Sequence, residues 1–206
     1  TKDHFFKAVC TLAIPVALQS MLQSSFSMVD QIMIGQLGEI NVAGVGLAGK
    51  FASIYSVVIS AIGAVAGIMI AQYLGQKNRS EVRRSFFTNL LLGAGIAGMF
   101  MVICTLFPNQ IMGAYTRDVQ TRQAAAEYLM LISGTFVPMA GATLLSTLFR
   151  CLEKPRLPLY ASILSALLNT GLNYIMIFGK LGISPMGVRG AAFATVISQC
   201  ANFLLM

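Results

Sequence analysis

The sequence predicts an all-α protein, a polytopic bundle of six helices that cross a membrane. Of its 206 residues, 56% are hydrophobic and only 10% are charged, whereas soluble domains carry about 25% charged residues. Apolar stretches long enough to cross a bilayer as helices, which takes roughly 20 residues, recur along the chain. Short polar or Gly/Pro-rich segments separate them. We therefore expect the lipid bilayer to surround the protein.

The hydrophobic pattern gives approximate positions for the six spans. They are residues 12–35, 51–74, 85–107, 122–150 and 159–178, and a sixth span from 188 that is still apolar at Met206. The second helix begins earlier than its lipid-crossing part, near Asn41. Pro138 predicts a kink in the fourth span. Gly63 and Gly67, four residues apart, predict a close contact between the second span and another helix.

Lysines and arginines are distributed unequally between the two ends of these spans. One side carries Lys2, Lys7, Lys77, Arg79, Arg83, Arg84, Arg150, Lys154 and Arg156, and the other carries Lys50, Arg117, Arg122, Lys180 and Arg189. Cytoplasmic loops hold the excess of basic residues in membrane proteins. We therefore predict a multi-pass protein of the cell membrane with a cytoplasmic amino terminus. The net charge of +7 is then a topology signal, and nucleic acid is not expected as a partner.

The first span contains a polar stripe with an acidic residue. Gln19, Gln23, Ser27 and Asp30 are spaced by four, four and three residues, which places them on one face of a helix. A carboxylate near the middle of a bilayer costs roughly 2.5–3.5 kcal/mol. A polar stripe on a spanning helix must face protein or a water-filled cavity. The stripe is therefore either a seam that holds helices together or an ion or substrate site.

Similar stripes follow on the last two spans. Ser162, Ser165, Asn169 and Asn173 share one face of the fifth span, and Thr195, Ser198 and Gln199 lie on the sixth. Their oxygen atoms and donors are of the kind that hold Na⁺ or share a proton. Each residue alone fits a structural role, but three stripes in one small bundle favour a site.

Enzyme chemistry and cofactors are not expected. The spans contain one acid, so a catalytic carboxylate pair is absent, and the sequence has no HExxH, GxSxG or phosphate-binding loop motif. The four cysteines are scattered without metal or redox spacing and are interpreted as small apolar fillers. His4, the single histidine, lies in the amino-terminal tail, which excludes a histidine metal site.

Several segments resemble the multidrug and toxic compound extrusion (MATE) transporters. They are MVDQIMIGQLGEINVAGVGLAG, GIMIAQYLGQKNRSEVRR, LFRCLEKPRLPLYASILSALLNTGLNYIMIFG and GVRGAAFATVIS, in the order in which the family carries them. The resemblance covers nearly the whole chain. It implies a transporter of twelve helices in two lobes, of which residues 1–206 are the amino-terminal lobe. We therefore expect this chain to be a fragment whose partner is the missing carboxy-terminal lobe.

The resemblance also implies a cation site. By match to the family it uses Asp30, Asn169, Asn173 and Thr195, with Asp30 and Asn169 as candidate Na⁺ ligands. The expected lining of the substrate cavity is Gln19, Gln23, Ser27, Ser165 and Gln199. Many family members carry an acid where this chain has Asn173. The site then has one carboxylate, which weakens the case for Na⁺ against H⁺ as the coupling ion.

Three functions compete at this point. The first is a cation-coupled antiporter, driven by H⁺ or Na⁺, that exports hydrophobic cationic drugs and toxic compounds by alternating access. The second is a lipid-linked sugar flippase of the same superfamily, which would need Arg or Lys within the spans to bind a diphosphate. The third is a membrane scaffold subunit that transports nothing, in which the polar stripes only join helices.

Overall fold

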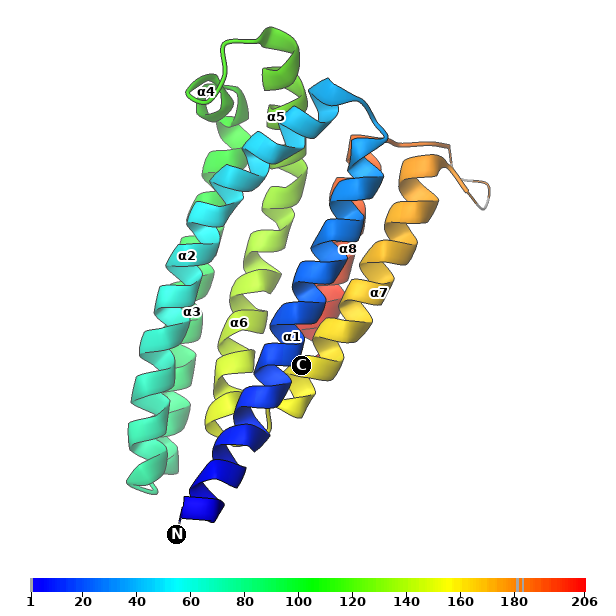
Figure 1. Cartoon of the computed structure of the whole chain (residues 1–206). Helices are drawn as coiled ribbons and strands as arrows, with labels where there is room; N and C mark the ends of the chain where they lie inside the picture. The colour runs from blue at the N-terminus through cyan, green and yellow to red at the C-terminus, as the bar shows by residue number, and fades with distance from the viewer. Residues whose placement is uncertain (1, 181, 183) are drawn as a thin grey trace.

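The computed structural model describes the backbone of residues 2–180, 182 and 184–206 and the side chains from residue 13 onward, again without 181 and 183. The described chain is helical and shows no strand (Figure 1). The helices are α1 (Lys2–Gly35), α2 (Glu39–Gly75), α3 (Arg79–Leu106), α4 (Pro108–Gly113), α5 (Val119–Ile132), the 3₁₀ turn η1 (Ser133–Thr135), α6 (Phe136–Cys151), α7 (Arg156–Phe178) and α8 (Val188–Leu205).

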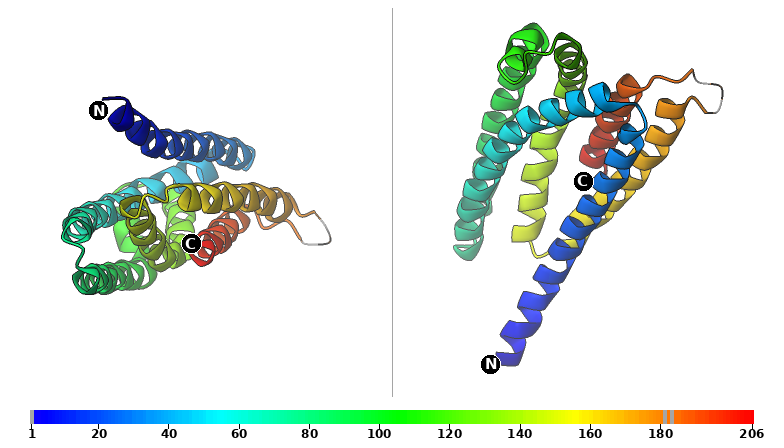
Figure 2. Two further views of the ribbon diagram at one scale, coloured as in Figure 1. Left: turned by 90° about the horizontal axis from the view of Figure 1, so that it is seen from below. Right: turned by 45° about the horizontal axis from the view of Figure 1, so that its top comes forward.

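The long helices run alternately up and down the bundle (Figure 1). α5, η1 and α6 form one interrupted rod, and α4 is a short helix at the same end as the start of α5. Seen from below, α1 lies on one side of the other helices (Figure 2). It packs mainly against α7 and only lightly against α2. This uneven packing leaves room between α1 and α2, where the larger of two polar cavities lies.

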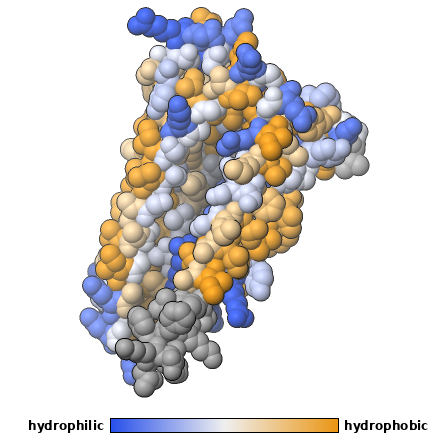
Figure 3. All heavy atoms as spheres, viewed as in Figure 1, coloured by the Kyte–Doolittle hydropathy of each residue, from blue (hydrophilic) through white to orange (hydrophobic). Residues whose placement is uncertain are grey.

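The all-α membrane fold is confirmed. Within the described residues, five segments are long and apolar enough to cross a membrane: α2, α3, the α5–α6 rod, α7 and α8. α1 is the sixth long helix, and its side chains are described only from residue 13 onward. Apolar residues gather on the outer flanks of the bundle, with paler residues in the strip between them (Figure 3). The apolar flanks are the surfaces suited to lipid.

Two predicted loops are shorter than expected. The polar segment 75–84 is helical from Arg79, because Asn78 caps α3 by accepting a hydrogen bond from the backbone N–H of Glu81 at 3.3 Å. The segment 108–121 contains α4, which starts at Pro108, and the first residues of α5. Asp118 caps α5 in the same way. Hydrogen bonds from the side chain and backbone of Thr121 lower the pKa of the Asp118 carboxyl.

The α-helix of the fourth span is interrupted close to Pro138, where the sequence predicts a kink. The interruption is η1, which ends at Thr135, three residues before Pro138. Pro138 has no N–H to donate to the carbonyl four residues earlier, that of Gly134, which lies within η1. The buried hydroxyl of Tyr55 on α2 donates to the backbone carbonyl of Phe136 at 2.6 Å. This bond attaches α2 to the first residue after the break.

The predicted close contact of Gly63 and Gly67 is also confirmed, and its partner is α6. A Cβ added at Gly63 would lie 3.3 Å from Thr143, and one at Gly67 would lie 3.0 Å from Thr147. The thiol of Cys151 donates to the carbonyl of Gly67 at 3.5 Å. The small residues therefore allow the α2 backbone to approach a row of hydroxyl groups on α6.

Among the described glycines, Gly190 makes the tightest approach to the backbone of another helix, and it joins α8 to α7. A Cβ at this position would lie 2.7 Å from the carbonyl oxygen of Met176. The backbone N–H of Met186 donates to the same carbonyl at 2.9 Å. Because the obstacle is backbone, no side-chain rotation can make room for a methyl group.

We expect Gly190→Ala to destabilise the bundle by about 1–3 kcal/mol, the usual cost of overpacking. Gly98→Ala on α3 is the matched control, since a Cβ there meets nothing within 4 Å. That change should be neutral or stabilising by up to about 1 kcal/mol, because alanine is the better helix former. Thermal unfolding of both variants in the same detergent measures the difference. Equal midpoints for the two variants would contradict a close α7–α8 contact.

Candidate functional site

The polar stripe of α1 faces the interior of the bundle. Gln19 is buried, and its side-chain amide donates to the Ser162 hydroxyl on α7 at 2.8 Å. Further along α1, Gln23, Ser27 and Asp30 line a cavity of about 260 Å³. The stripe therefore meets the stripes of α7 and α8, as the helical periodicity requires.

Asp30 is held by an amide from α7. The Nδ2 group of Asn173 donates to Oδ1 of Asp30 and also, at 3.2 Å, to Oδ1 of Asn169. Asn173 is fully buried and lies behind the cavity, whereas Asp30 and Asn169 line it. The Oδ1 atom of Asn173 is buried and has no hydrogen-bond partner among the described residues. Asn173 thus connects the carboxyl group to the polar face of α7.

Ser198 on α8 continues this network. Its hydroxyl accepts from Nδ2 of Asn169 at 3.2 Å, and its backbone carbonyl accepts from the Ser165 hydroxyl at 2.6 Å. Thr195, one turn earlier, donates its hydroxyl proton to the Ala191 carbonyl at 2.9 Å and also lines the cavity. Its oxygen lone pairs can accept a further donor or a cation. α1, α7 and α8 therefore share one hydrogen-bonded network around Asp30.

Sequence reasoning missed Asn202, which lines this cavity, and Tyr128, which lies next to it. Tyr128 on α5 is buried, and its phenol group lies beside Thr195 and within electrostatic reach of Asp30. A buried tyrosine hydroxyl needs a polar partner, so a tyrosine within an apolar span was the available signal. The polar partner of the Tyr128 hydroxyl depends on how α5 packs against α8. The residue pattern of α5 alone does not show that packing.

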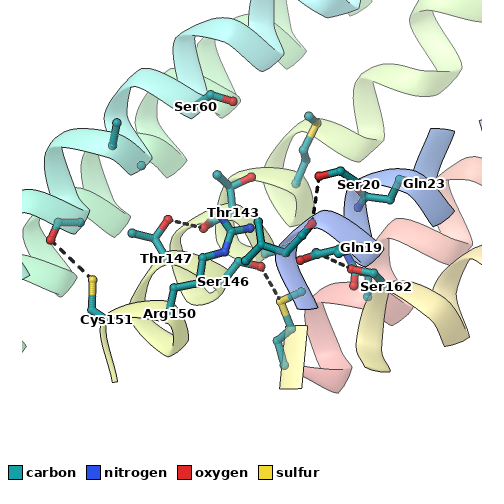
Figure 4. Close-up of a pocket in the computed structure, with 18 of the residues that line it drawn as sticks. Gln19, Ser20, Gln23, Ser60, Thr143, Ser146, Thr147, Arg150, Cys151 and Ser162 are labelled. Atoms are coloured by element: carbon teal, nitrogen blue, oxygen red, sulfur yellow. Dashed lines mark hydrogen bonds between the residues drawn. The ribbon is translucent and has the colours of Figure 1, made fainter. Parts of the chain in front are cut away.

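A second, larger cavity of about 540 Å³ adjoins the first (Figure 4). Its lining comes from α1, α2, α6, α7 and α8, and four residues line both cavities. These shared residues are Gln23, Ser162, Gln199 and Asn202. Polar side chains therefore connect the cavity at Asp30 with the larger cavity.

The structure brings the predicted site residues together. Asp30, Asn169 and Thr195 line the smaller cavity and Asn173 backs it. Of the expected substrate lining, Ser27 and Ser165 belong to the smaller cavity, Gln19 to the larger, and Gln23 and Gln199 to both. Their roles in binding a cation or a substrate remain predictions.

The chemistry of the donors limits what the site can hold. Among the described residues, no group of three or more His, Cys, Asp or Glu side chains is placed to hold a metal ion. One carboxylate, four side-chain amides and five hydroxyl groups line the smaller cavity. These oxygen atoms can accept a proton or contact a singly charged cation.

A family model and curated relatives both match this chain. The MatE family model matches residues 15–175. The probable multidrug resistance protein NorM of Thermotoga maritima is 31% identical over 94% of this chain and 42% of its own length. The probable multidrug resistance protein YoeA of Bacillus subtilis is 25% identical over the whole chain and 45% of its own length. The chain thus spans less than half the length of these relatives.

Solved structures agree on the fold. An outward-facing structure of a multidrug resistance MATE family transporter of the MOP superfamily superposes with a TM-score of 0.88 at 21% identity. The superposition covers 96% of this chain and 43% of that one. A MOP superfamily transporter from Pyrococcus furiosus gives the same TM-score and identity. The match to the family model covers most of the sequence, and the chain therefore belongs to the MatE family.

Proposed function

We propose that this chain is one lobe of a cation-coupled antiporter that exports hydrophobic organic cations by alternating access. The observation that carries the proposal is the position of Asp30. It is the acid among the described residues that line the two cavities, and it belongs to a network that joins α1, α7 and α8. Family membership and the multidrug resistance names of the relatives support it.

Competition for one carboxylate would couple the entry of the ion to the export of the organic cation. A proton or Na⁺ on Asp30 removes or neutralises the charge that attracts an organic cation, so each ligand displaces the other. Exchange of one coupling ion for one singly charged organic cation moves no net charge, so the concentration gradient of the ion drives it. A ten-fold ion gradient supplies about 1.4 kcal/mol, enough for a ten-fold gradient of the exported cation.

Asn173 favours H⁺ as the coupling ion in this proposal. Na⁺ gains affinity from each carboxylate among its ligands, and the amide of Asn173 adds none. A proton needs a single carboxylate and an alternative hydrogen-bond arrangement. The network around Asp30 supplies both.

Alternating access requires a second wall opposite this lobe. The relatives are more than twice as long as the region that matches, which supports a carboxy-terminal lobe as the partner. Rocking of the two lobes would then expose the cavities to each side in turn. A scaffold role accounts less well for the polar groups, because many of them line open cavities rather than helix contacts.

The first test concerns Asp30. We expect Asp30→Asn to preserve expression and folding, because the amide keeps the shape of the side chain and removes a costly charge. Efflux of a fluorescent cation from vesicles containing the full-length protein should fall to background, since the amide neither takes up a proton nor offers a negative charge to Na⁺. Glu39→Gln is the matched control, because Glu39 is exposed at the start of α2. Gradient-dependent efflux by the Asp30 variant would exclude the coupling role.

The second test concerns the choice of ion. Asn173→Asp adds a carboxylate next to Asp30 and should increase the dependence of efflux on a Na⁺ gradient relative to a pH gradient. Asn109→Asp is the control, because Asn109 is exposed on α4, away from both cavities. The measurement is the ratio of initial efflux rates under the two gradients. An unchanged ratio would mean that position 173 does not select the ion.

The third test concerns orientation, which we propose to be amino terminus inside. Single cysteines at Gln76 and Arg117, both exposed and at opposite ends of α3, report the two sides. In a background without the natural cysteines, an impermeant maleimide should label position 117 on intact cells. Position 76 should react only after the membrane is permeabilised. The reverse pattern would invert the topology.

A further inference from the structure

A groove on the flank of the bundle takes no part in the proposed transport. It lies between the second half of α1 and the second half of α7, which run side by side (Figure 1). Its volume is about 630 Å³. None of its described lining residues lines either polar cavity. The groove is therefore a separate feature of the surface and needs its own occupant.

The α1 wall of the groove is mostly apolar. It consists of Val29, Ile32, Met33 and Gln36, whose spacing places them in one stripe along the helix. This stripe is distinct from the polar stripe that contains Asp30. Ile32 is 66% exposed, so the groove is open to its surroundings. An open apolar surface on a spanning helix is suited to lipid.

Two aromatic residues on α7 form the opposite wall. Tyr174 and Phe178 lie one turn apart, and their ring centroids are 5.9 Å from each other in an edge-to-face arrangement. Tyr174 is 51% exposed, so its ring also faces outward. Aromatic residues are enriched where a span meets the lipid headgroups. The two walls together form an apolar slot near one end of the spans.

A cation stands at the end of this slot. Gly179 ends α7 with a left-handed φ of 67°, and the N–H of Lys180 donates to the Ile175 carbonyl at 3.0 Å. This cap fixes the backbone of Lys180 beside the groove. Lys180 forms no ion pair with a described residue, and the described lining contains no Asp or Glu. The ammonium group is therefore available to an anion.

We propose that the groove binds an anionic phospholipid, with an acyl chain between the two walls and its phosphodiester on Lys180. The α1 wall from Val29 to Gln36 covers about 10 Å along the helix axis, and the cation lies at the end where headgroups are found. The amine of a zwitterionic headgroup would find no acid in the described lining. An apolar face of a second lobe would leave Lys180 without a counter-charge.

A lipid in this groove would pack against the contact that holds Asp30. Val29 precedes Asp30 on α1, and Tyr174 follows Asn173 on α7. The acyl chain would therefore cover the outer side of the α1–α7 contact without entering the polar cavities. This inference rests on membrane embedding and not on coupled transport, so neither result of the Asp30 test affects it.

The test maps where a photoreactive lipid binds. Full-length protein is placed in phosphatidylcholine nanodiscs with a trace of phosphatidylglycerol that carries a diazirine in one acyl chain. After illumination, mass spectrometry of peptides counts the lipid adducts. Adducts on residues 29–36 and 174–178 should exceed those on the exposed face of α3 around Leu91 about five-fold. One basic side chain near a charged headgroup contributes a preference of about this size.

Three variants identify the cause of the enrichment. Lys180→Gln should remove it, whereas Lys180→Arg keeps the charge and should retain it. Arg117→Gln removes an exposed cation between α4 and α5, outside the groove, and should leave the enrichment unchanged. Adducts on α3 should be equal in all three variants, which shows that each is folded and inserted.

Four outcomes would overturn the lipid site. Equal adducts in the groove and on α3 would mean general contact with the bilayer only. An absence of adducts in the groove would mean that another protein segment, such as the second lobe, covers it. Enrichment that survives Lys180→Gln would exclude headgroup binding by Lys180. An equal loss in Arg117→Gln would assign the effect to surface charge in general.

Discussion

Placing one carboxyl group inside an apolar bundle is the constraint on which the rest of this structure depends. The cost of Asp30 in a bilayer must be offset by donors from other helices. Asn173 donates to it, Asn169 accepts from Asn173, and Ser198 accepts from Asn169. This chain of contacts requires α1, α7 and α8 to pack together. The missing side chain at Gly190 allows two of them to approach closely enough.

The cavities follow from how α1 satisfies its polar groups. α1 packs mainly against α7, because the partners of Gln19 and Asp30 are there. It therefore contacts α2 only lightly, and the space between them opens into the larger cavity, which α6 closes from behind. Polar side chains in this space cannot face lipid. The interaction that stabilises Asp30 thus also creates a polar surface suited to a ligand.

The sequence predicted the helices and the stripes well. An apolar helix with one polar residue per turn has only one orientation that turns these residues away from lipid. It placed the starts of α3 and α5 too late, because polar and charged residues beyond the bilayer can belong to a helix when a cap such as Asn78 is present. It missed Tyr128, whose place near Asp30 depends on packing between distant segments. Arg150 was counted only as a topology signal, since nothing local to α6 shows that it enters a cavity.

The amide at position 173 has a chemical advantage for a site that exchanges a proton. An ionised carboxyl group only accepts hydrogen bonds, whereas a protonated one also donates. Asn173 can serve both states, because its Nδ2 donates to the carboxylate and its Oδ1, unpaired among the described residues, can accept from the acid after the amide turns over. A second ionised carboxylate could pair only with the protonated form. In the proposed proton exchange, one acid beside one amide would therefore keep α7 in contact with α1 in both protonation states.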